Sequence, residues 1–306
     1  MVILSILIIL ILGVLPALLQ GSAYPVHKDF AFLARFKAPM IRIIFIAGNR
    51  ILSFLPRLKF KEEGISVKDE TLGNGVKGWM IKPKETWEHG RCILFIHGGG
   101  FVYKGAPYHY SYALKYAKSS GCDLFFVDYS MAYNTEYGTP LNDCIAAYKE
   151  LCTRYSKVSI VGDSAGGFLA LKAALASERK PDRLCLIYPV VDCSMRTASM
   201  TAFRDAPLWN SVNNKKMWDY YLKGHKEKSL LDEDFSAFPP TYIEIAQYDC
   251  LRDEGKLLAE RMTEQGVRVT LRQTNGTMHG YDAVMKSFIS KESLRSRIEF
   301  LSGNPS

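Results

Sequence analysis

The chain has 306 residues, 48% of them hydrophobic, and a formal net charge of +8 at pH 7. This length suits one α/β domain with an attached segment better than two independent domains, and the hydrophobic share excludes a disordered or low-complexity chain. The seven cysteines are scattered without a C-x-x-C pair, which argues against a disulfide framework or a zinc site.

An apolar run opens the chain and extends over residues 2–19. Its 18 residues would rise about 27 Å as a helix, close to a hydrocarbon core of about 30 Å. We therefore expect residues 1–20 to form a single transmembrane signal-anchor. A cleaved signal peptide is the alternative, since Gly21, Ser22 and Ala23 could form a cleavage site. The run is long for a signal peptide, however, and no basic residue precedes it.

The basic charge is concentrated directly after this run. Residues 24–61 carry eight Lys or Arg side chains and one acid, Asp29, so the rest of the chain is nearly neutral. Basicity beside an apolar N-terminus favours anionic lipid headgroups over nucleic acid. Apolar residues recur between the basic ones at roughly helical spacing, which predicts an amphipathic juxtamembrane or cap segment. The alternatives are a solvated helix face and a helix packed on the body.

From residue 64 onward, short apolar runs alternate with helical patterns. The predicted strands are 65–70, 76–82, 92–96, 124–128, 158–161, 184–189, 241–246 and 267–272. The predicted helices are 110–119, 143–155, 165–177, 252–265, 282–289 and 292–301. This alternation predicts a mostly parallel eight-stranded sheet with helices on both faces, whose functional site lies at the carboxyl ends of the strands.

The strand over 158–161 is followed by a G-x-S-x-G pentapeptide. Its residues, with one further glycine, are Gly162-Asp163-Ser164-Ala165-Gly166-Gly167. Such a motif turns a strand sharply into a helix with the serine at the apex, and the glycines prevent backbone collisions. The helix N-terminus then aims its N–H groups at a developing oxyanion. We predict that Ser164 is a nucleophile; a plain glycine-rich turn is the alternative.

A second glycine-rich loop follows the strand over 92–96. It reads His97-Gly98-Gly99-Gly100-Phe101, the form of an oxyanion loop in which bare backbone N–H groups approach the substrate. We expect Gly98, Gly99 and Ala165 to donate to the oxyanion, and His97 to hold the loop through hydrogen bonds. A phosphate loop is excluded because Ala106 stands where that motif requires lysine.

A serine nucleophile needs a base that a carboxylate orients, and in this chain order the acid precedes the histidine. Asp249 follows the strand over 241–246, and His279 follows the last strand. Asp253 is a rival acid, but its place in a helix start predicts that it caps the helix or supports the site residues without contacting the substrate. The remaining histidines lack a matching partner, which predicts surface or structural roles; they are His27, His89, His109 and His225.

Together these motifs resemble those of the hormone-sensitive lipase family of α/β-hydrolases, and within it the anchored arylacetamide deacetylase and neutral cholesterol ester hydrolase group. The resemblance covers residues 60–303, with a departure from the family pattern at 129–136. It implies an α/β-hydrolase fold over 62–303, hydrolysis of carboxylic esters through an acyl-enzyme, and no metal or organic cofactor. It also implies a helical cap, formed by the N-terminal segment and an insertion over 193–238.

The predicted pocket combines aromatic residues of the insertion with residues of the motifs. The candidates are Phe101, Asp163, Trp209, Trp218 and Tyr281. Aromatics suit an apolar acyl pocket, although ordinary cap packing is the alternative for each of them.

The sequence therefore predicts a membrane-anchored serine hydrolase that cleaves lipophilic esters or amides, with membrane lipid as a partner and no nucleic acid. An acyltransferase on the same site and a non-catalytic ligand-binding receptor of the same fold are the alternatives. We expect a single-pass protein of the endoplasmic reticulum membrane. The basic residues favour a cytosolic body, whereas the resemblance implies a luminal one.

Overall fold

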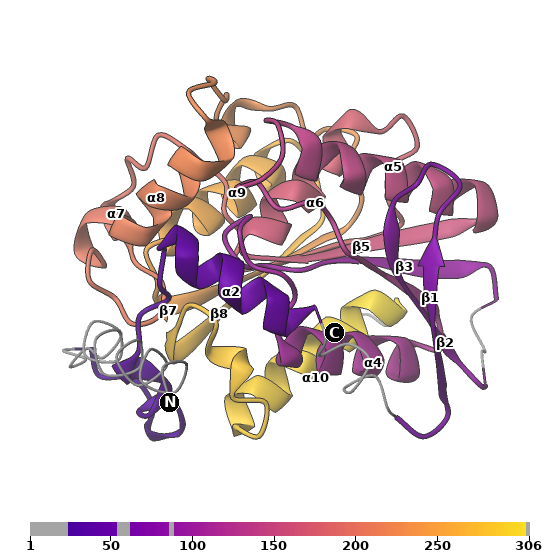
Figure 1. The fold of residues 1–306 in the computed structure, drawn as a ribbon, viewed down its shortest axis with the longest axis horizontal. Coiled ribbons are helices and arrows are strands. Elements are labelled where there is room, and N and C mark those ends of the chain that lie inside the picture. Colours follow the sequence, from indigo (N-terminus) through magenta and orange to yellow (C-terminus); the bar gives the residue numbers. More distant parts are fainter. Residues whose placement is uncertain (1–23, 54–61, 86–88, 304–306) are drawn as a thin grey trace, which may run out of the picture.

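The computed structural model describes residues 24–53, 62–85 and 89–303. One eight-stranded sheet forms its centre, in the order β1-β2-β4-β3-β5-β6-β7-β8 (Figure 1). The strands are β1 (Ile65–Thr71), β2 (Lys77–Pro83), β3 (Arg91–Ile96), β4 (Asp123–Val127), β5 (Lys157–Asp163), β6 (Leu184–Ile187), β7 (Thr241–Tyr248) and β8 (Val269–Met278). Only β2 runs antiparallel to its neighbours, β1 and β4, and the others pair in parallel. The predicted mostly parallel, eight-stranded sheet is confirmed.

Helices cover both faces of the sheet. The α-helices are α2 (Arg42–Leu52), α4 (Pro107–Ser120), α5 (Thr139–Arg154), α6 (Ala165–Ala176), α7 (Ala198–Ala202), α8 (Ser211–Leu222), α9 (Arg252–Glu264) and α10 (Phe288–Ser302). The short 3-10 turns are η1 (Lys28–Phe30), η2 (Leu33–Arg35), η3 (Leu230–Asp232) and η4 (Tyr281–Ala283). Figure 1 shows α4 and α10 below the sheet and α5, α6 and α9 above it. Because both faces are covered, β4 and β6 are buried throughout, as their continuous apolar runs predict.

Two predicted elements differ from the observed ones. The last strand extends to Met278, six residues beyond the predicted end, because its second half still pairs with β7. The predicted helix over 282–289 is wrong: η4 ends at Ala283, and α10 begins only at Phe288. In this stretch the Asp282 carboxylate is bound by Tyr188 and Arg297, and these buried contacts hold the chain in an irregular conformation.

The N-terminal segment and the insertion over 193–238 meet above the carboxyl ends of the strands. Backbone hydrogen bonds join them, from the Ala38 N–H to the Leu208 carbonyl and from the Leu208 N–H to the Phe36 carbonyl, each 2.8 Å long. The Asn213 side chain also donates to the Ala38 carbonyl at 2.8 Å. These contacts make the two segments one cover over that end of the sheet.

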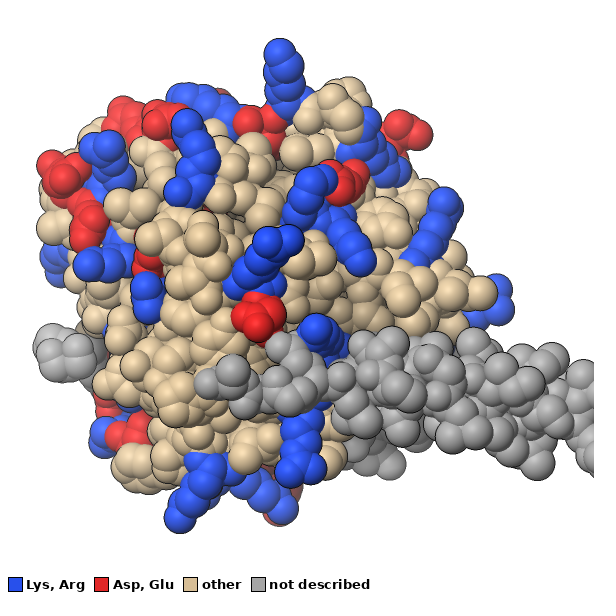
Figure 2. All heavy atoms as spheres, turned by 90° about the vertical axis from the view of Figure 1, so that its left-hand side faces the viewer, with Lys and Arg blue, Asp and Glu red and all other residues tan. Residues whose placement is uncertain are grey.

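The predicted anchor over residues 1–20 lies outside the described residues, as do residues 54–61 of the basic segment. Among the helices within 24–53, 62–85 and 89–303, none is both long and apolar enough to cross a bilayer. On the left-hand side of the molecule, basic side chains are interspersed with acidic ones rather than forming one continuous patch (Figure 2).

Candidate active site

The turn from β5 into α6 holds Ser164 in a strained backbone conformation, with φ 53° and ψ −122°. Its N–H donates to the Ile187 carbonyl of β6 at 2.9 Å, which fixes the turn against the sheet. A Cβ atom on Gly162 would lie 2.4 Å from the Gly166 carbonyl oxygen, and one on Gly166 would lie 2.1 Å from the Ile96 carbonyl oxygen. Glycine is therefore required on both sides of the serine, as the motif predicts.

Three predicted residues meet at the carboxyl ends of β5, β7 and β8. The Ser164 Oγ lies 2.8 Å from the His279 Nε2, and the His279 Nδ1 lies 2.7 Å from the Asp249 Oδ2. The other Asp249 oxygen accepts the Leu251 N–H at 2.9 Å. Because the carboxylate requires a proton on Nδ1, the Nε2 atom is free to accept the hydroxyl proton of the serine. The arrangement can therefore move a proton off Ser164.

Burial and packing fix this hydrogen-bonded chain in place. The exposed fractions of Ser164, His279 and Asp249 are 5%, 7% and 0%. The centroid of the His279 ring lies 4.6 Å from that of the Tyr188 ring and 5.9 Å from that of the Trp209 ring. The rival acid Asp253 points elsewhere, since its carboxylate accepts the Ser199 N–H at 2.8 Å.

The glycine loop after β3 faces the serine, but not with the predicted set of donors. The Gly98 N–H donates to the Asp163 Oδ1 at 2.9 Å, so the prediction that it serves an oxyanion is wrong. Gly99 and Gly100 both line the same pocket as Ser164. Within the described part of the chain, the N–H groups of Gly99, Gly100 and Ala165 have no hydrogen-bond acceptor. These three groups are the available donors.

His109, which sequence analysis left without a partner, lies in the same pocket. Its Nε2 is 3.1 Å from the Asp163 Oδ2, and both side chains are almost completely buried. Burial alone would raise the pKa of the Asp163 carboxyl, but His109 and the Gly98 N–H outweigh it and hold that pKa below its usual value. Asp163 is therefore an anion directly behind the nucleophile.

The pocket above Ser164 has a volume of about 330 Å³ and a mostly apolar lining. Its walls come from the N-terminal segment through Leu33, Ala38 and Leu52, and from the insertion through Leu208 and Trp209. Two predicted pocket residues, Trp209 and Asp163, line it. The N-terminal segment was expected to form part of a cap, but no motif in the sequence marks which of its residues line this wall.

Three other pocket predictions are wrong, since these side chains are buried away from the pocket. Phe101 and Trp218 pack on Phe168 at ring distances of 5.8 and 5.2 Å, within the core beneath the insertion. The Tyr281 hydroxyl donates to the buried Glu244 carboxylate at 2.6 Å, and its ring lies in a second core cluster. The aromatic residues led to the prediction of pocket positions, but these three rings pack in the core instead.

Comparisons with known proteins decide the family. The family described as alpha/beta hydrolase fold matches residues 93–283, which is more than half of the chain. Carboxylesterase NlhH of Mycobacterium tuberculosis (strain ATCC 25618 / H37Rv) is 30% identical over 209 residues, covering 62% of this chain and 66% of that protein. The chain belongs to the hormone-sensitive lipase-like family of α/β-hydrolases. This membership places it among the carboxylic ester hydrolases.

Two further proteins similar to this α/β-hydrolase are named as a lipase and an esterase. Lipase 2 of Moraxella sp. (strain TA144) is 27% identical over 279 residues, covering 73% of this chain and 64% of that protein. The solved structure of a bacterial heroin esterase has a TM-score of 0.78 and 27% identity, covering 92% of this chain and 99% of that one. The chain spans about two thirds of the length of the curated relatives it matches.

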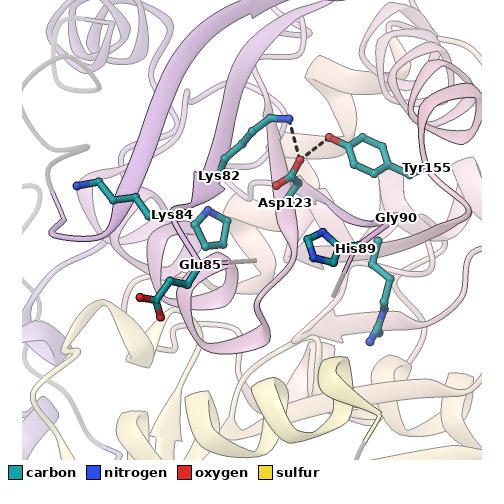
Figure 3. Close-up of a pocket in the computed structure, with 9 residues that line it drawn as sticks. Lys82, Lys84, Glu85, His89, Gly90, Asp123 and Tyr155 are labelled. Atoms are coloured by element: carbon teal, nitrogen blue, oxygen red, sulfur yellow. Dashed lines mark hydrogen bonds and ion pairs between the residues drawn. The ribbon is translucent and has the colours of Figure 1, made fainter. Parts of the chain in front are cut away.

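A second hollow of the α/β-hydrolase, about 450 Å³ in volume, lies at the amino ends of β3 and β4, away from Ser164. One of its two carboxylates, Asp123, is bound by the Lys82 ammonium at 2.9 Å and by the Tyr155 hydroxyl at 2.7 Å (Figure 3). Among the described residues that line this hollow, no nucleophile is paired with a base. Within the described ranges, no cluster of three or more His, Cys, Asp or Glu side chains is arranged to hold a metal ion.

Proposed function

We propose that the protein is a serine hydrolase that cleaves carboxylic esters through an acyl-enzyme, with Ser164, His279 and Asp249 as its catalytic triad. The observation that carries this proposal is the continuous hydrogen-bonded chain from the Ser164 Oγ through the imidazole to the Asp249 carboxylate, at 2.8 and 2.7 Å, on the floor of an apolar pocket. A receptor that only binds ligand has no need for such a chain.

In the first step the Ser164 Oγ attacks the ester carbonyl carbon while the His279 Nε2 takes the hydroxyl proton. Asp249 orients the imidazole and stabilises its positive charge. The N–H groups of Gly99, Gly100 and Ala165 are available to bind the oxyanion that forms on the carbonyl oxygen. The imidazolium then gives its proton to the departing alcohol. Water repeats the sequence on the acyl-enzyme, which releases the acid and restores Ser164.

The pocket favours a lipophilic group of limited size. A volume of about 330 Å³ is at the lower end of the range for small-molecule sites, roughly 300–1,000 Å³. Its walls offer aliphatic and aromatic carbon from Leu33, Leu52, Leu208 and Trp209. We therefore expect p-nitrophenyl esters with short to medium acyl chains to give higher kcat/KM than long-chain esters.

Replacing Trp209 with Ala should shift this preference toward longer chains. The Trp209 ring limits the pocket beside His279 and Gly100, so its removal lengthens the space for an acyl group. We expect the kcat/KM ratio of octanoate to acetate esters to rise about tenfold. Trp218→Ala is the matched control, because Trp218 packs outside the pocket, and it should leave the ratio unchanged. An unchanged ratio in Trp209→Ala would show that the acyl group binds elsewhere.

We further propose that residues 1–20 anchor the protein as a single pass in the endoplasmic reticulum membrane, and that α2 rests on the lipid surface. The inner face of α2 is fixed on the body by Phe45 and Asn49, which are buried. Its outer face exposes Ile43 and Ile51, eight residues apart and therefore on one side of the helix, at 70% and 66%. Exposed apolar side chains beside Arg42 and Arg50 suit an anionic lipid surface.

A double variant, Ile43→Ser with Ile51→Ser, tests this lipid contact. We expect severalfold slower hydrolysis of a lipophilic ester dissolved in phosphatidylserine vesicles, and an unchanged rate on water-soluble p-nitrophenyl acetate. Leu257→Ser is the control, since Leu257 is exposed on α9. An equal loss on both substrates would mean that the helix matters for folding and not for lipid. Carbonate extraction and protease protection of microsomes test the anchor and its orientation.

A further inference from the structure

We propose that His109 is a positioning residue that acts through Asp163, and that this pair holds the Gly98–Gly100 backbone in the conformation that receives an oxyanion. The inference rests on the proposed function for the chemistry at Ser164. It differs from that function because neither side chain exchanges a proton with the substrate.

The two nitrogens of His109 have different partners. The Ala106 N–H donates to the Nδ1 at 2.8 Å, so Nδ1 carries no proton and Nε2 carries one. The Nε2–H therefore donates to the Asp163 Oδ2 at 3.1 Å. His109 is the third residue of α4, and by accepting the Ala106 N–H it also caps that helix. The imidazole is fixed at both ends.

Asp163 connects the fixed imidazole of His109 to the glycine loop. Its Oδ1 accepts the Gly98 N–H at 2.9 Å. There is no space for a side chain at residue 98, because a Cβ atom on Gly98 would lie 2.3 Å from the Asp163 Oδ2 and 3.1 Å from the Ser164 Cβ. Gly98 is therefore needed for this close approach.

The next two peptide groups are held through their carbonyl oxygens. The His97 Nδ1 donates to the Gly98 carbonyl at 2.6 Å, and burial lowers the pKa of His97 to about 3, so this imidazole is neutral. The Gly99 carbonyl accepts the Tyr103 N–H at 2.9 Å. In a trans peptide the N–H points opposite to the carbonyl, so these bonds turn the Gly99 and Gly100 N–H groups away from them. Gly99 and Gly100 line the pocket with Ser164.

Three variants of His109 distinguish its hydrogen bond to Asp163 from its capping of helix α4. In His109→Gln, the amide oxygen can accept the Ala106 N–H and the amide nitrogen can donate to Asp163, so both bonds remain. His109→Glu can still cap the helix but cannot donate to Asp163. His109→Leu loses both bonds. We expect kcat to fall about 10- to 100-fold in the Leu and Glu variants with KM within about twofold, and to stay within about threefold of wild type in the Gln variant.

The control is Ser120→Ala, which removes a buried hydrogen bond at the other end of α4, from the Ser120 Oγ to the Tyr116 carbonyl. It should weaken the helix without changing kcat. A second measurement is independent of activity: amide hydrogen exchange of Gly98 in the full-length chain labelled with ¹⁵N-glycine. Faster exchange of the Gly98 amide in His109→Leu and His109→Glu, and not in His109→Gln, supports the proposal.

Equal losses of kcat in the Gln and Leu variants would overturn the proposal, because they would assign a chemical role to the imidazole. Unchanged Gly98 exchange in His109→Leu would also overturn it. If Ser164→Ala retained activity, the proposed function would fail, yet the exchange measurement would still decide whether His109 fixes the loop.

Discussion

Replacing Ser164 with Ala is expected to lower kcat on p-nitrophenyl acetate by about 10³- to 10⁶-fold. The methyl group of alanine cannot attack the carbonyl or give a proton to His279, and triad members act as a unit, so the other two residues cannot compensate. The strained backbone at residue 164 is held by the Ile187 carbonyl and by the two neighbouring glycines, which remain in the variant. The loss should therefore be a loss of chemistry, measurable as kcat with little change in thermal stability.

Ser177→Ala is the matched control for this variant. Ser177 is also buried and caps the far end of α6, where its hydroxyl donates to the Ala173 carbonyl at 2.8 Å. It makes the same chemical change at the opposite end of the same helix, and kcat should stay unchanged. Retention of more than about a tenth of wild-type activity in Ser164→Ala would contradict the assignment of the nucleophile.

Replacing Arg297 with Met should lower the free energy of unfolding by about 3–5 kcal/mol. Arg297 is completely buried, and its guanidinium binds the carboxylates of Glu244 and Asp282, the latter at 2.9 Å. Burial would raise the pKa of the Glu244 carboxyl, but Arg297 and the bound tyrosine hydroxyls keep that pKa below its usual value. Without the arginine, two buried carboxylates lose their counter-charge. Urea denaturation of both proteins measures the difference.

Arg295→Met is the control for Arg297→Met. Arg295 lies on the same helix but is exposed, and its ion pairs with Glu292 and Glu299 are on the surface. Such pairs contribute little, so the change should stay within about 1 kcal/mol. A loss in Arg297→Met no larger than in this control would mean that the buried network does not stabilise the fold.

The buried network around Arg297 also constrains His279, through Asp282 and Tyr188. The Asp282 carboxylate accepts the Tyr188 hydroxyl at 2.6 Å, and the Tyr188 ring packs on His279. Tyr188 has a φ of 35°, which a tyrosine adopts only when its surroundings impose it. We therefore expect Arg297→Met to lower kcat as well, through a less constrained imidazole.

Sequence was sufficient to group Ser164, Asp249 and His279, because each follows a predicted parallel strand and such strands end at one edge of a sheet. It was insufficient for Gly98. Whether that N–H faces an oxyanion or the Asp163 carboxylate depends on a contact between residues 65 positions apart. His109 was missed for the same reason, since its partner Asp163 lies 54 positions away in the sequence and meets it only in the folded chain. Tyr188 carries no motif at all.

The aromatic residues illustrate a second limit. Trp209 and Trp218 come from the same insertion and are equally apolar, yet only Trp209 lines the pocket. Trp218 lies on α8 and packs inward on Phe168, whereas Trp209 precedes that helix and faces His279. Composition predicts that an insertion will bury aromatic rings, but the direction of each ring follows from how the insertion docks on the N-terminal segment.

Covalent labelling with a fluorophosphonate, followed by mass spectrometry of the intact and digested protein, tests the central claim most directly. The reagent forms a stable bond only with a serine that an adjacent base activates. We expect one adduct per chain, located on Ser164, in the wild-type protein and none in Ser164→Ala or His279→Ala. An adduct on another serine, or an unlabelled wild-type protein that still hydrolyses esters, would contradict the assignment of Ser164 as the nucleophile.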